Sequence, residues 1–172
     1  MNKLLNLLDE FIVEKNASWN HQDWLSLLDR INSNGIKIPE SELGEILENE
    51  KYRKFFKTFA TREYSVENIV FYEEVKKFKK LNEEERKIRS LEMIEIFLNT
   101  ESMLEINTTA ELTKEILRNV EESKEDLFDK MLSDLTFGTI SNSYDRFLFS
   151  DLYQEMMIKE KLKKKPQYYL FK

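Results

Sequence analysis

Hydrophobic residues recur along most of this chain at spacings of three and four positions, which is the period of an amphipathic helix. The first such stretch, over about 3–16, places leucines and a phenylalanine on one face and acidic residues on the other. A second stretch, over about 22–33, is followed by Gly35, a residue type that commonly ends helices in the left-handed conformation. Pro39 then suits the first turn of another helix. The amino end is therefore predicted to form consecutive helices.

The middle of the chain continues this pattern after a short break near Asn49. We predict helices over about 51–61, 66–80 and 82–98. Ser65 is a typical N-cap for the second of these, and Asn82 forms a capping-box pattern with Glu85 for the third. The apolar residues expected to line the third helix are Ile88, Leu91, Met93 or Ile94, and Leu98.

Further helices are predicted in the carboxyl half, after a non-periodic stretch over 100–107. Two more capping-box pairs are Thr108 with Glu111 and Ser123 with Asp126. The helix that the second pair opens should fray near Gly138, and a last helical stretch should follow Ser143. The pattern as a whole predicts an all-α protein of about nine helices with no convincing strand.

Composition supports this fold class. A chain of 172 residues suits one core of ordinary size. Average usage would give about 12 Gly and 9 Pro at this length, whereas the sequence has Gly 3 and Pro 2. Tight hairpin turns are therefore scarce, which argues against a many-stranded sandwich or barrel. The absence of cysteine excludes a disulfide scaffold.

Charge and hydropathy indicate which partners and which cellular location to expect. The formal net charge of −6 repels nucleic acid, so no nucleic-acid partner is expected. No apolar run approaches the length of a membrane span, and no signal peptide is recognised, so a cytoplasmic protein is the expectation. The lysine-rich stretch Lys159–Lys165, followed by aromatic residues, is the candidate for weak peripheral membrane contact, with a solvated terminus as the alternative.

Side chains for enzymatic chemistry are scarce. The single histidine, His21, cannot form a histidine-rich metal site, and isolated glycines make no phosphate-binding loop. We therefore expect no cofactor, no metal and no catalytic group. The segment from Asp29 to Glu42 has the residue types of a calcium loop but is two positions too long, so an ordinary helix connection is the favoured interpretation and calcium binding the alternative.

Three separated pieces of the sequence together resemble the regulator of G-protein signalling (RGS) domain. The pieces are Phe56-Lys57-Thr58-Phe59 with Glu63-Tyr64-Ser65 and Glu67-Asn68-Ile69, then Glu105-Ile106-Asn107, then Phe128-Asp129 with Ser143-Tyr144-Asp145-Arg146-Phe147. Their order and separations agree with the family over about 40–158. The resemblance implies an RGS-like bundle of about nine helices with an antiparallel four-helix subdomain, in which the helix over 66–80 and its successor form a hairpin. It also divides the chain into an amino-terminal helical extension (1–39), the RGS-like domain (40–158) and a basic, aromatic tail (159–172).

The resemblance implies a GTPase-activating protein for heterotrimeric G-protein α subunits (Gα), which stabilises the Gα switch regions in the transition state and supplies no catalytic group. The implied Gα-binding residues are Glu63, Tyr64, Glu67 and Asn68 in a first loop, Asn107 in a second, and Asn142, Ser143 and Arg146 in a third. Arg146 is expected to orient the third loop. Asn68, Asn107 and Ser143 also suit caps and turns, and an RGS-homology interaction module without GTPase-activating activity is the alternative function.

The sequence departs from the family pattern at three positions. Asn142 stands where the third loop usually has an aspartate, and Gly138 falls where a leucine normally adds apolar contact. Tyr72 replaces the usual tryptophan, which is a tolerable exchange in a core. The first two departures predict weak activity or activity toward particular α subunits only.

Overall fold

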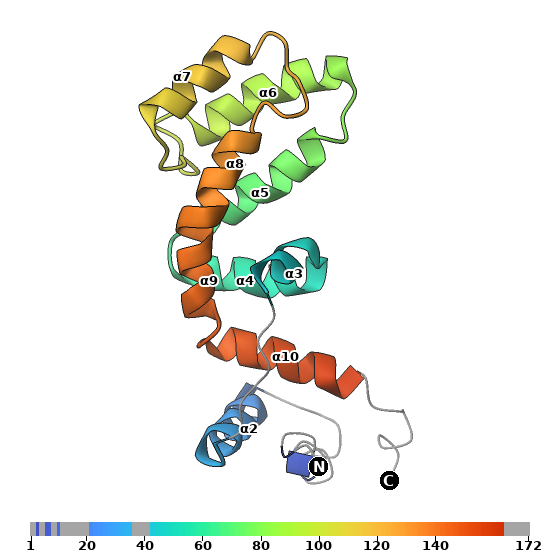
Figure 1. Ribbon diagram of the computed structural model, residues 1–172. Coiled ribbons are helices and arrows are strands. Elements are labelled where there is room, and N and C mark those ends of the chain that lie inside the picture. The colour runs from blue at the N-terminus through green and yellow to red at the C-terminus, as the bar shows by residue number, and fades with distance from the viewer. Residues whose placement is uncertain (1–2, 4–5, 8–9, 11–20, 36–41, 164–172) are drawn as a thin grey trace. The chain divides into compact units, whose positions relative to one another are not determined.

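The computed structural model describes residues 3, 6–7, 10, 21–35 and 42–163, and within these ranges it contains helices and no strand (Figure 1). The elements are α2 His21–Ser33, α3 Leu43–Glu48, α4 Glu50–Arg62, α5 Val66–Phe78, α6 Glu83–Phe97, α7 Ala110–Asn119, α8 Asp129–Leu135, the π-helical η1 Thr136–Ile140, α9 Ser141–Phe147 and α10 Asp151–Lys163. The all-α prediction is confirmed. None of these helices is long and apolar enough to cross a membrane. The predictions for 11–20, Pro39 and the tail beyond Lys163 fall outside the described residues.

The chain divides into two compact units, Met1–Phe56 with Arg146–Lys172, and Lys57–Asp145. In the first unit α2 contacts α10, and Leu27 and Ile31 of α2 are fully buried. Three aromatic rings pack against one another in this core. Phe147 lies 5.0 Å from Phe56 and 5.3 Å from Tyr153, measured between ring centroids. Gly35, just after α2, has φ +61, which confirms it as the left-handed terminator.

The second unit contains the four helices α5 to α8, with α5 in contact with both α6 and α8. Phe71 on α5 is fully buried, and its ring meets those of Phe97 and Phe128 edge-on at 5.1 and 5.9 Å. Phe78, at the other end of α5, also meets Phe128 edge-on at 5.1 Å. Only a short connection separates α5 from α6, so the two helices run antiparallel as a hairpin, as predicted.

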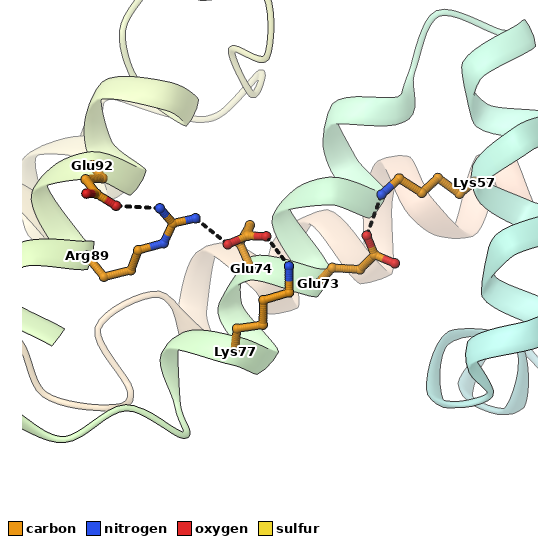
Figure 2. A network of polar contacts seen from close by, with 6 residues as sticks. All are labelled: Lys57, Glu73, Glu74, Lys77, Arg89 and Glu92. Atoms are coloured by element: carbon orange, nitrogen blue, oxygen red, sulfur yellow. Dashed lines mark hydrogen bonds and ion pairs between the residues drawn. The ribbon is translucent and has the colours of Figure 1, made fainter. Parts of the chain in front are cut away.

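Charged side chains join the hairpin along its surface (Figure 2). Glu74 of α5 accepts hydrogen bonds from Lys77 of the same helix (2.7 Å) and from Arg89 of α6, and Arg89 also donates to Glu92 at 2.5 Å. Burial by itself would raise the pKa of Glu74, but the hydrogen bonds from Lys77 and Arg89 outweigh it and hold this pKa below its ordinary value. The neighbouring Glu73 pairs with Lys57 of α4 at 2.5 Å.

The predicted capping box of α6 is confirmed, because the Glu85 N–H donates to Asn82 Oδ1 (3.0 Å) and the Asn82 N–H donates to Glu85 Oε2 (3.2 Å). Ser65 is the N-cap residue of α5, as predicted, but its hydroxyl makes no capping hydrogen bond and donates back to the carbonyl of Ala60 (3.4 Å). The prediction for α7 is wrong by one residue. The N-cap of α7 is Thr109, not Thr108.

The prediction that Ser123 caps a helix is also wrong. Ser123 is buried with φ +43, and its hydroxyl lies 3.0 Å from that of Ser90 on α6. Arg86, one turn earlier on α6, donates through Nε to the Ser123 carbonyl at 2.9 Å. These contacts fix the segment between α7 and α8 against α6, so α8 begins only at Asp129.

The predicted apolar face of α6 is wrong in part. Ile88 and Leu91 are 66% and 61% exposed, whereas Ser90 and Met93 are buried. The buried face of α6 instead runs through Ser90, Met93 and Phe97, and the Ser90 hydroxyl on this face meets the hydroxyl of Ser123. Leu98 ends the helix as its half-buried C-cap.

The prediction that the helix containing α8 frays near Gly138 is wrong. The helix continues through η1 into α9, where the Ser141 N–H is shared between the carbonyls of Thr136 and Gly138. The bond from Ser141 to Thr136 spans five residues, which is the π-helical pattern. Thr136 also donates its hydroxyl to the Leu132 carbonyl at 2.7 Å, a contact that tends to bend a helix. The break comes later, in the turn before α10.

Candidate functional site

Three segments of the second unit lie where α5 begins and α6 ends, and we call them the loop end. They are the α4–α5 connection (63–65), the α6–α7 connection (98–109), and η1 with the first turn of α9 (136–143). α5 contacts η1, and the Ile106 N–H donates to the Phe97 carbonyl at the end of α6 (2.9 Å). The first contact brings together segments that are far apart in the sequence, and the second holds the α6–α7 connection against the end of α6.

The first connection is a helix C-terminal motif with an unusual residue at its turning point. The Ser65 N–H donates to the Ala60 carbonyl (2.9 Å) and the Tyr64 N–H donates to the Thr61 carbonyl (3.3 Å), which together form a Schellman motif. Tyr64 occupies the left-handed position with φ +55, where glycine is the common residue. Its side chain is 94% exposed. The tyrosine therefore carries a backbone cost that no packing within the described chain offsets.

Asn68 and Glu67, in the first turn of α5, hold this connection in place. The amide nitrogen of Asn68 donates to the Ser65 carbonyl (3.1 Å) and to Glu67 Oε1 (2.6 Å), and the Asn68 side chain is buried. Glu63 is half-buried, and its N–H donates to the Phe59 carbonyl at 3.1 Å. Asn68 thus acts within the loop, which is one of the structural roles foreseen from the sequence.

Asn107 stands at the surface of the second connection. The residue before it, Ile106, is buried and anchors the segment, while Asn107 itself is exposed. Asn107 lines a cavity of about 220 Å³ together with residues of α7, α8 and η1, among them Asp134 and Thr139. This cavity joins the second predicted loop to the third.

The third segment contains the remaining predicted residues. Ser143 is buried in the first turn of α9, and Asn142 beside it is exposed. Arg146 is exposed on the last turn of α9 and belongs to the first unit. Gly138 lies within η1, and a Cβ built on it would meet nothing within 4 Å.

One exposed residue of the loop end was not singled out by the sequence patterns. It is Phe137, on η1, whose side chain is 84% exposed. The buried positions around it are Met131, Leu135, Ile140 and Ser143. The step of five from Leu135 to Ile140 is longer than a helical turn, and this is the signal from which the π turn could have been read.

Within the described ranges, no group of three or more His, Asp or Glu side chains is placed to hold a metal ion. The loop end instead offers amide, carboxylate and aromatic groups, which suit contact with another macromolecule.

The family model of the regulator of G protein signaling domain matches residues 42–156. This is well over half of the 172 residues, so the chain belongs to the RGS domain family, and the predicted resemblance is confirmed. Domains of this family generally bind G-protein α subunits and lack catalytic residues of their own. In a comparison with curated proteins, the chain has no match.

Proposed function

We propose that this chain accelerates GTP hydrolysis by a Gα subunit by binding the Gα switch regions through the loop end. Gα already carries the arginine and the water-positioning glutamine, yet it hydrolyses GTP at only about 10⁻² s⁻¹. A protein that binds the transition-state conformation more tightly than the ground state lowers the barrier without adding a reacting group. Acceleration of tenfold to a thousandfold requires about 1.4 to 4 kcal/mol of such differential binding.

The observation that carries the proposal is the geometry of Tyr64. Two backbone hydrogen bonds hold this residue in the left-handed conformation, and its ring is almost fully exposed. An aromatic side chain has only two χ angles, so it loses little entropy on binding, and it can bury a large apolar area. We assign Tyr64 to the Gα contact for this reason.

Asn107 is the proposed contact to the catalytic region of Gα. Its amide can donate and accept at once, so it can bridge a switch hydroxyl and the Gα glutamine. Glu63, Glu67 and Asn142 are proposed to surround this contact, the buried Ser143 to support the third segment from inside, and Arg146 to orient that segment. Because Asn68 is engaged within the first loop, we propose that it positions Glu67 and Tyr64.

Single-turnover GTP hydrolysis by a panel of Gα subunits tests the proposal. We expect acceleration of at least one subunit, and tightest binding to Gα loaded with GDP and aluminium fluoride. Asn107→Ala should lower the acceleration tenfold or more, and Asn107→Asp should also lower it because a carboxylate cannot donate. Asn119→Ala is the matched control, since Asn119 is an exposed asparagine at the other end of α7.

An interaction module without GTPase-activating activity is the second candidate, favoured by the neutral Asn142 and the missing side chain at Gly138. Binding that is equal for the GDP, GTP-analogue and aluminium fluoride states would support it. The absence of acceleration across the panel would overturn the first proposal. We propose separately that the RGS-like domain extends over 40–158, between the amino-terminal extension and the tail. We also propose that the protein is cytoplasmic and that Lys159–Lys165 makes weak contact with a membrane.

A further inference from the structure

Phe137 is an exposed aromatic residue at the point where the α8–α9 helix is irregular. Its side chain is 84% exposed, and it lies in the only π-helical turn among the described residues. A single exposed hydrophobic residue is ordinary on a protein surface. A π turn is not, because it is rare and occurs frequently at functional sites.

Local contacts show that this turn is built into the fold. The hydroxyl of Thr136 binds the Leu132 carbonyl, and the Ser141 N–H reaches back to the Thr136 carbonyl. Ile140 after the turn is fully buried, as Leu135 before it is nearly so. The extra residue of the π turn therefore lets the helix keep its buried face on both sides of Phe137, while Phe137 stays in water.

The surroundings of Phe137 connect it to the proposed Gα contact. Thr139, two residues further along, lines the same cavity as Asn107. Asn142 follows in the first turn of α9, and α5, which begins beside Tyr64, contacts η1. Phe137 thus belongs to the third segment of the loop end, five residues before Asn142, which is already assigned to the Gα contact.

We infer that Phe137 is an apolar anchor for a Gα switch segment and supplies the contact that Gly138, lacking a side chain, does not. This inference rests on the proposed function. Aromatic anchors commonly dominate the affinity of an interface because a single ring excludes much water. Since Phe137 touches no reacting group, it should set the affinity for Gα and leave the maximal rate of hydrolysis nearly unchanged.

The variants are chosen to separate an anchor from a structural residue. Phe137→Ala should raise the concentration of this protein needed for half-maximal acceleration by about tenfold or more, with little change in maximal acceleration. Phe149→Ala is the matched control, because Phe149 is 85% exposed in the turn before α10. It should leave both quantities unchanged. Melting temperatures of the two variants should stay close to that of the unchanged chain.

A second variant tests whether the apolar contact can be moved by one position. A Cβ at Gly138 meets nothing within 4 Å, so Gly138→Leu introduces no clash at Cβ. Combined with Phe137→Ala, it should restore a large part of the lost affinity for Gα loaded with GDP and aluminium fluoride.

The outcomes distinguish the inference from the function on which it rests. If the unchanged chain accelerates a Gα subunit and Phe137→Ala behaves like the Phe149 control, the inference is overturned and the proposed function stands. If the unchanged chain accelerates no subunit, both fail. A selective loss of affinity in Phe137→Ala, with rescue by Gly138→Leu, supports the inference.

Discussion

The α5–α6 hairpin and the loop end belong to the same compact unit, but their side chains are used in opposite ways. In the hairpin, aromatic rings meet one another inside the core and charged groups pair across the surface, as Phe71 with Phe97 and Glu74 with Arg89 do. At the loop end, Tyr64 and Phe137 extend into water. The aromatic rings and these charged groups of the hairpin find their partners within the chain, whereas the loop end exposes aromatic surface to solvent.

The largest expected effect tests the interior side of this comparison. Phe71→Ala removes a fully buried ring that contacts Phe97 and Phe128, so it should lower the free energy of unfolding by about 3–5 kcal/mol. Ile88→Ala, on the exposed side of α6, should cost less than about 0.5 kcal/mol. Urea denaturation measures both. Equal losses would contradict the assignment of inward and outward faces.

The next effect is smaller and depends on pH. Glu74→Gln should lower the free energy of unfolding by about 1–2 kcal/mol at pH 7, because it removes the charge that Lys77 and Arg89 contact. The folded-state pKa of Glu74 is depressed, so its contribution is present above the ordinary glutamate pKa of about 4.3 and is lost as pH falls through the folded-state value.

Denaturation at pH 7, 5 and 3 measures this dependence. The difference between Glu74→Gln and the unchanged chain should shrink toward the lowest pH. Glu92→Gln is the control, since the Glu92 side chain is 52% exposed and its pair with Arg89 should contribute less than about 1 kcal/mol. A difference that grows on acidification would show that the pair does not act as described.

The smallest effect tests the loop end, and it has the opposite sign. Tyr64→Gly should raise the free energy of unfolding by about 0.5–1 kcal/mol, because glycine adopts the left-handed conformation without a Cβ clash. Tyr64→Ala should give no such gain. Both variants should lose Gα affinity to a similar extent, which thermal melts and pull-down measurements can compare. A loss of stability in Tyr64→Gly would mean that the exposed ring supports the fold.

The amino-acid sequence predicted regular elements well where local signals agree. Asn82 and Glu85 form their capping box because both partners lie within one turn of the same helix. Gly35 ends α2 for an equally local reason, its freedom at positive φ. The candidate site was predicted only through the family resemblance, since exposed loop residues such as Asn107 follow no periodic pattern.

Misleading capping patterns show where local reasoning fails. Ser123 has the right residue type and spacing to begin a helix, but its hydroxyl is held by Ser90 from α6. Thr108 and Thr109 are equally suited to cap α7, and only the path of the connection selects Thr109. In both cases a competing contact or backbone path, absent from the local pattern, decides the outcome.

The sequence by itself determined that this chain is helical, where most helices begin and end, and to which family it belongs. The tertiary structure decided which face of α6 is buried, how α8 passes through a π turn into α9, and that Phe137 stands in water. The physical reason is the distance along the chain over which each interaction acts. Capping and periodicity act within a few residues, whereas the inward face of a helix depends on partners such as Ser123, which lies 33 positions from Ser90.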